Sequence, residues 1–113
     1  MPKKLKIPRV IIESPFKGEG DLFLRNLTYA REALLHSLGL GEAPFASHLF
    51  YPQVLDDSVE EERGKGIACG LVWAKKCTFV AVYEDLGIST GMEFAIAEHK
   101  AKKRTIVYRK IRG

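Results

Sequence analysis

The clearest pattern in the chain is a change of hydrophobic period between residues 78 and 101. Residues 78–83 form a continuous run of apolar and β-branched side chains, which is typical of a buried strand. Residues 85–91 follow as a loop with two glycines and two hydroxyls. From residue 92 the apolar positions take up helical spacing. One face of this helix would carry Met92, Ala95, Ile96 and His99.

A similar strand, loop and helix are predicted near the start of the chain. Residues 7–13 form a β-branched run in which Pro8 must lie at the beginning, because a missing N–H is tolerated there. After a loop at 14–20, Asp21 is a candidate cap for a helix that ends near Gly39. The apolar stripe of this helix would consist of Phe23, Leu27, Ala30, Leu34 and Leu38.

The middle of the chain is less regular. Two prolines bracket residues 44–52, where a short second strand with a loop after it is expected. Residues 56–63 are typical of the acidic start of a helix, with Ser58 and Glu61 matching a capping box. The glycines of this second helix either weaken it or allow close approach to a neighbouring backbone or ligand. They are Gly64, Gly66 and Gly70, and the apolar face comprises Ile67, Leu71 and Ala74 with Ala68 and Val72.

Residues 104–108 form a last short strand. The order of elements, with connections of helical length, predicts a parallel sheet with right-handed crossovers and helices on both faces. We therefore expect a small three-layer α/β/α fold, Rossmann- or flavodoxin-like, with a mostly parallel sheet of four or five strands. At 113 residues, the whole chain 1–113 is expected to form a single domain.

In open α/β sheets, ligands bind in the crevice at the carboxyl ends of the strands. The helix that starts at residue 92 offers free N–H groups to an anion there, and Glu93 in its first turn is expected to face the same crevice. The loop at 14–20, with Ser14, Lys17 and two glycines, is placed to hold phosphate; an ordinary turn is the alternative.

Composition narrows the function classes. Hydrophobic residues make up 46% and charged residues 28% of the chain, as in ordinary globular proteins. No apolar run approaches the roughly 20 residues of a membrane span, and the N-terminus lacks the apolar core of a signal peptide. A cytoplasmic protein without membrane contact is expected. Cys69 and Cys77 match no metal motif, so we expect buried free thiols, no metal and no cofactor.

The net charge of +4 raises the question of nucleic-acid binding. No aromatic side chains are interleaved with the positive ones for base stacking, so a solvated basic face is favoured over a nucleic-acid interface. A positive field would still attract a phosphorylated small molecule. The basic residues concentrate at the ends of the chain: Lys3, Lys4, Lys6 and Arg9, then 100–104 and 109–112.

Several motifs together resemble a known superfamily. A helix containing Trp73 precedes the central strand, and Gly87-x-x-x-Gly91-Met92-Glu93 opens the next helix. This arrangement is similar to that of the nucleoside 2-deoxyribosyltransferase superfamily, which includes 2′-deoxynucleoside 5′-monophosphate N-glycosidases. The segments Glu42–His48 and Asp85–Met92 resemble most closely a small branch found in phages and bacteria. The likeness covers nearly the whole chain, and these two segments are its most specific parts.

The resemblance implies a chemistry and a set of site residues. In the superfamily a glutamate at the helix start attacks the anomeric carbon of a deoxyribonucleoside, and Glu93 matches that position. The superfamily also has an acid shortly before the tryptophan; here residues 67–72 contain none, and Asp56, Asp57 or His48 are candidates to replace it. The implied substrate-binding residues are Ser14, Lys17, Gly18, His48, Asp85, Gly87, Ser89, Gly91 and Met92.

Three functions are therefore open. The first is an N-glycosidase or deoxyribosyltransferase that acts on a (deoxy)nucleoside 5′-monophosphate through Glu93. The second is a non-catalytic nucleotide binder that senses or sequesters a nucleotide signal, which in a phage setting would act in the host cytoplasm. The third is an interaction protein that uses the basic tail. The favourable dipole of a helix N-terminus alone also explains Glu93. A homodimer or larger homo-oligomer is expected.

Overall fold

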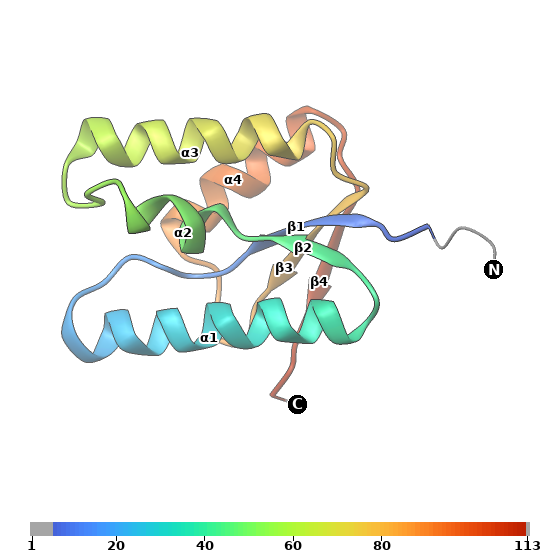
Figure 1. The fold of residues 1–113 in the computed structure, drawn as a ribbon, viewed down its shortest axis with the longest axis horizontal. Coiled ribbons are helices and arrows are strands. Elements are labelled where there is room, and N and C mark those ends of the chain that lie inside the picture. Colours follow the sequence, from blue (N-terminus) through green and yellow to red (C-terminus); the bar gives the residue numbers. More distant parts are fainter. Residues whose placement is uncertain (1–5, 113) are drawn as a thin grey trace.

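Four parallel strands form the centre of the molecule (Figure 1). In this computed structural model the described residues are 6–112, so Lys3 and Lys4 of the basic N-terminal cluster and Gly113 lie outside them. The sheet has the order β2-β1-β3-β4, and each neighbouring pair is parallel. The strands are β1 (Arg9–Glu13), β2 (Ala43–Phe45), β3 (Phe79–Tyr83) and β4 (Ile106–Arg109).

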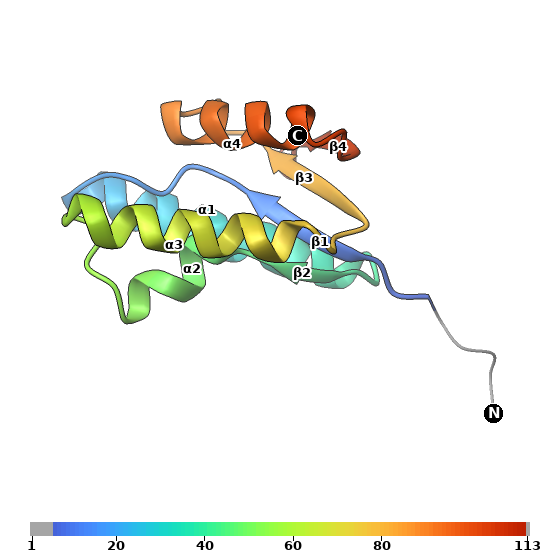
Figure 2. The ribbon, with the colours of Figure 1, turned by 90° about the horizontal axis from the view of Figure 1, so that it is seen from above.

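Helices cover both faces of this sheet, in three layers (Figure 1). The first helix, α1 (Gly20–Gly39), packs on one face, while α3 (Glu60–Ala74) and α4 (Thr90–Ala101) pack on the other. Seen from above, α3 and α4 run side by side, and β1 and β3 lie beneath them (Figure 2). This confirms the predicted α/β fold class. The helices are α1 (Gly20–Gly39), α2 (Ser47–Phe50), the 3-10 helix η1 (Tyr51–Gln53), α3 (Glu60–Ala74) and α4 (Thr90–Ala101).

Alternation along β1 divides the core between the two faces of the sheet. Val10 and Ile12 pack towards α1, whereas Ile11 packs towards α3 and α4. Because side chains alternate along a strand, Glu13 is on the same face as Ile11. A carboxylate at the end of a buried strand is thus directed towards α3 and α4.

The buried face of α1 differs from the predicted apolar stripe. Leu38 is 54% exposed, and Asp21 lies in the first turn, after the N-cap residue Glu19. Ala30 of the predicted stripe is buried, and other members of it are half-buried: Phe23, Leu27 and Leu34. The other fully buried positions were missed, because polar side chains with fixed partners face the sheet and small alanines allow close packing. Asn26, for example, donates to the carbonyl of Lys17 at 3.0 Å. The buried residues are Asn26, Tyr29, Ala30, Ala33 and Ser37.

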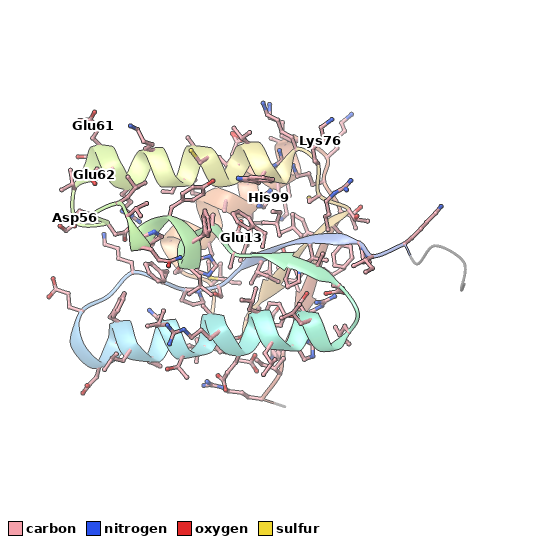
Figure 3. All side chains as sticks on the ribbon, in the orientation of Figure 1. Glu13, Asp56, Glu61, Glu62, Lys76 and His99 are labelled. Carbon is pink, nitrogen blue, oxygen red and sulfur yellow. The ribbon has the colours of Figure 1, made fainter. Side chains whose placement is uncertain are left out.

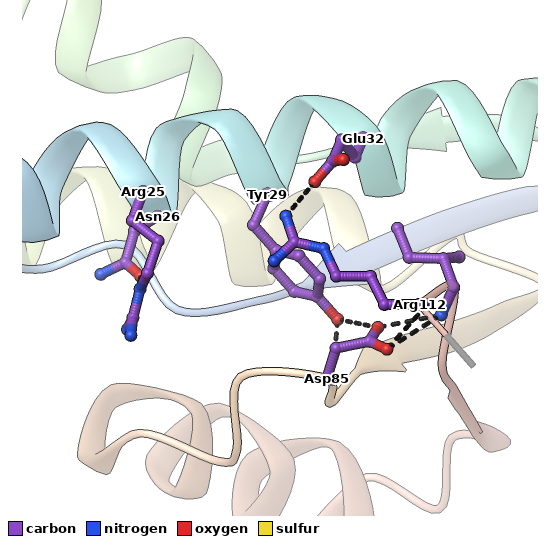
Figure 4. Close-up of polar contacts among 7 residues, drawn as sticks. Arg25, Asn26, Tyr29, Glu32, Asp85 and Arg112 are labelled. Carbon is purple, nitrogen blue, oxygen red and sulfur yellow. Dashed lines mark hydrogen bonds and ion pairs between the residues drawn. The ribbon is translucent and has the colours of Figure 1, made fainter.

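Asp85 ties α1 to the C-terminal segment (Figure 4). Tyr29 Oη donates to its Oδ1 at 2.6 Å, and the backbone amides of Ile111 and Arg112 donate at 2.9 Å. Burial alone would raise the pKa of Asp85, but these hydrogen bonds lower it to about 2. Arg112 also covers the ring of Tyr29 and pairs with Glu32. The carboxylate therefore has an architectural function.

The segment before α3 also differs in part from expectation. The short second strand is present as β2, but α2 and η1 replace most of the predicted loop. The capping box at Ser58 and Glu61 is absent: α3 begins after Val59, and the Ser58 hydroxyl donates to Asp56 Oδ1 at 2.6 Å. Within residues 6–112, no helix combines the length and hydropathy needed to cross a bilayer.

Candidate functional site

A cavity of about 870 Å³ opens at the carboxyl ends of β1 and β3. The strand order changes direction between these two strands, which is where open α/β sheets bind ligands. The loop after β1, the start of α4, segment 45–57 and the inner side of α3 all contribute to its walls. Its volume is within the range of sites for small organic molecules.

One end of the cavity is suited to an anion. The N-terminus of α4 lines it through Ser89, Thr90 and Gly91, and Ser89 Oγ accepts from the amide of Met92 at 3.2 Å. The other free amides of this first turn, and the helix dipole, remain available to a ligand. Arg63 and Lys17 line the same cavity from α3 and the β1 loop. Arg63 reaches the helix start, since its Nη2 is 3.9 Å from the position of a Cβ on Gly91.

A serine and a histidine form a polar pair on the cavity wall. Ser14 Oγ and His48 Nε2 are 2.8 Å apart, and the ring of Phe16 lies against that of His48 with centroids 5.8 Å apart. Burial lowers the pKa of His48, while the negative charge of Glu13 acts in the opposite direction. His48 is therefore neutral at pH 7 and offers the ligand a hydrogen-bonding group without charge.

Glu13 contributes a carboxylate to the same cavity. Its Oε2 lies 2.8 Å from Nε2 of His99, a fully buried side chain on α4 (Figure 3). Nδ1 of His99 is in turn 2.9 Å from Nη1 of Arg104. Asp57 and Glu62 also line the cavity, with Asp57 Oδ2 4.0 Å from Nε of Arg63.

The remaining wall is apolar and aromatic, and it includes Phe16, Phe45 and Tyr51. Tyr51 accepts a 2.8 Å hydrogen bond at its hydroxyl from the indole of Trp73. This wall depends on close packing of α2 against α3: a Cβ on Gly70 would lie 2.5 Å from Ser47 Oγ. Of the two alternatives for the α3 glycines, close approach to a neighbouring element therefore applies at Gly70.

The structure brings most of the predicted site residues together. Asp56, a candidate replacement for the missing acid, is exposed and outside the lining, whereas Asp57 and His48 line the cavity. Asp85 and Gly87 also lie outside, because Asp85 is committed to Tyr29 and the C-terminal backbone. The predicted binding residues that do line the cavity are Ser14, Lys17, Gly18, His48, Ser89, Gly91 and Met92.

Glu93 does not face this cavity, contrary to the expectation from the sequence. Its side chain is exposed and is not part of the lining. The reason is helical geometry: Gly91 and Ala95 point to the cavity, and Glu93 lies midway between them in sequence, on the opposite side of the helix. Any role of Glu93 in catalysis thus remains a prediction from the resemblance alone.

Several lining residues were not singled out from the sequence, notably Glu13, Arg63 and Tyr51. Glu13 had one usable signal in the sequence, because it is the charged residue that ends a buried strand.

Among the described residues, no group of three or more His, Cys, Asp or Glu side chains could hold a metal ion. Cys69 and Cys77 are free and half-buried, and burial raises the pKa of Cys77.

Comparisons with known proteins agree with this fold. The 2-deoxyribosyltransferase of the psychrotolerant bacterium Bacillus psychrosaccharolyticus superposes with a TM-score of 0.65 at 16% sequence identity. The match covers 90% of this chain and 72% of that one, and at this identity it shows a common fold only. No curated protein matches the sequence. A family described as a domain of unknown function (DUF7768) matches residues 8–109, and the chain belongs to that family.

Proposed function

We propose that this chain binds a nucleoside 5′-monophosphate in the cavity at the ends of β1 and β3. The observation that supports this most strongly is the combination of an anion-binding end and an aromatic wall in one cavity of about 870 Å³. The α4 amides, Arg63 and Lys17 would hold the phosphate. Phe16, Phe45 and Tyr51 would flank the base, since every base presents a face to aromatic side chains.

Calorimetric titration with nucleoside 5′-monophosphates and the matching nucleosides tests this proposal. We expect the monophosphates to bind about 10- to 100-fold more tightly, because the phosphate adds charge-assisted hydrogen bonds. Arg63→Ala should remove most of that difference. Lys65→Ala is the matched control, since Lys65 is an exposed cation on α3 outside the cavity. Equal affinity for nucleoside and monophosphate, or no binding of either, would contradict the proposal.

Cleavage or transfer of the N-glycosidic bond is the second candidate function. Its support is the likeness in fold to a deoxyribosyltransferase together with the carboxylates Glu13, Asp57 and Glu62 in the cavity lining. Carboxylates stabilise the oxocarbenium-like transition state of glycosidic bond cleavage. Incubation with deoxynucleoside 5′-monophosphates, followed by chromatography for free base, separates the two functions. Absence of free base from every substrate, with binding intact, supports a non-catalytic binder.

The predicted nucleophile is tested in the same assay. If free base is released, its loss by several orders of magnitude in Glu93→Ala would assign the nucleophile to Glu93. Unchanged release would exclude Glu93.

A homodimer or larger homo-oligomer remains the expected assembly. Large apolar side chains are exposed on α1 and α3 and would be covered by a second copy. They include Leu24, Leu35, Val72 and Trp73. Sedimentation analysis of the purified chain distinguishes this expectation from a monomer.

A further inference from the structure

The carboxylate of Glu13 is held by His99, and the ring of His99 is held in turn by Arg104. Its Oε2 pairs with Nε2 of the fully buried His99 at 2.8 Å. Nη1 of Arg104, just before β4, lies 2.9 Å from the other nitrogen of that ring. In Figure 3 Glu13 and His99 lie together between β1 and the helices above it. The three residues thus connect the base of β4 to the cavity.

Hydrogen-bonding capacity fixes the direction of each bond in this chain. A guanidinium has five donors and no acceptor, so Arg104 must donate to Nδ1 of His99. Nδ1 then carries a lone pair, and the ring proton is on Nε2, from which it donates to Glu13 Oε2. The buried ring therefore acts as a fixed neutral donor that sets the rotation of the carboxylate.

One oxygen of Glu13 remains for a ligand. Among residues 6–112 the bond from His99 goes to Oε2, and no described side chain or amide donates to Oε1. The side chain is only 18% exposed and lines the cavity. A largely desolvated carboxylate oxygen gains more from a donor on a bound molecule than an exposed one does.

The distance between Glu13 and the N-terminus of α4 indicates which part of the ligand Glu13 contacts. His99 lies beyond two turns from the N-terminus of α4, and helical side chains lean back towards that terminus. The carboxylate is therefore on the order of 5–10 Å from the anion-binding end. In a nucleoside 5′-monophosphate the sugar follows the phosphate directly, so the sugar is the part at this depth.

We propose that Glu13 is the sugar-contacting carboxylate of the site. Its Oε1 accepts a hydrogen bond from a sugar hydroxyl, and His99 and Arg104 are positioning residues that hold the carboxylate in place. This inference rests on the proposed binding of a nucleoside 5′-monophosphate.

Binding to ligands with and without sugar hydroxyls tests the inference. The wild-type protein should prefer the tightest-binding ribonucleoside 5′-monophosphate over its 2′,3′-dideoxy counterpart by about 10- to 100-fold. Glu13→Gln should lower this preference about tenfold, since a neutral amide replaces the charged acceptor. Its amide oxygen can still accept from His99, so the fold is preserved. Glu61→Gln, an exposed carboxylate on α3 outside the lining, is the control.

The outcomes separate this inference from the proposed function. If no monophosphate binds, both fail. If a monophosphate binds but the wild type shows no preference for sugar hydroxyls, or Glu13→Gln weakens both ligands equally, only the assignment of Glu13 is overturned.

A ¹⁵N spectrum of the His99 ring tests the positioning chain independently of any ligand. The proton should be on Nε2 in the wild type and should stay there in Arg104→Met, because the Glu13 carboxylate can only accept, while the Nδ1 resonance should shift on loss of its donor. A proton on Nδ1 in the wild type would contradict the assignment.

Discussion

Gly70 provides a direct test of how the cavity wall is built. A Cβ at this position would meet Ser47 Oγ at 2.5 Å and Ser47 Cβ at 2.8 Å, both closer than real Cβ contacts. Gly64, on the same helix, has open space around it and serves as the matched control. Both substitutions to alanine gain the same helix propensity, about 0.5–1 kcal/mol. Their difference in unfolding free energy therefore isolates the steric conflict between α2 and α3.

Overpacking of this kind costs about 1–3 kcal/mol. Gly64→Ala should stabilise the protein by about 0.5–1 kcal/mol, and Gly70→Ala should be less stable than Gly64→Ala by about 1–3 kcal/mol. Urea denaturation measures both free energies. Adding Ser47→Gly to Gly70→Ala should recover most of the loss, because it removes both clashing atoms. Equal stabilisation by the two alanines would refute the close α2–α3 contact.

The remaining predictions concern charge and protonation. Asp85→Asn should lower the unfolding free energy by about 1–2 kcal/mol, as measured by urea denaturation at pH 7. Because the pKa of Asp85 falls to about 2 on folding, its contribution is full above about pH 4 and is lost as the pH falls towards 2; in Asp85→Asn this part of the pH dependence should disappear. Burial lowers the pKa of His48, so below about pH 6.5 the unfolded chain binds a proton more readily than the folded one. The unfolding free energy should therefore be highest above about pH 6.5 and decline below it. Thermal unfolding of His48→Gln between pH 5 and 7 should lack that slope, and an unchanged slope would show that another group causes it.

The sequence was sufficient to predict the sheet and the region of the site, because both follow from the apolar runs of the strands and from the loops after them. The apolar runs at β1 and β3 predicted buried strands, and the helical connections predicted that they are parallel, so the loops that follow them meet at one edge of the sheet. Met92, Ile96 and His99 were placed on one face of α4, and all three are buried.

The errors have specific physical causes. The inner face of α1 is polar and small, with Asn26 and Tyr29 held by distant partners, so hydrophobic spacing found Ala30 but missed the other fully buried positions. Asp85 looked like a ligand contact because nothing local reveals that the backbone near residue 111 returns to it. Glu93 was expected in the cavity from its position near the helix start, but a single residue shift around a helix turns a side chain by about 100°.

A crystal structure with a bound nucleoside 5′-monophosphate tests the central proposal most directly. We expect phosphate density at the N-terminus of α4 within reach of Arg63, and a sugar hydroxyl within hydrogen-bond distance of Glu13 Oε1. Phosphate bound away from α4, or a ligand outside the cavity between β1 and α3, would contradict it.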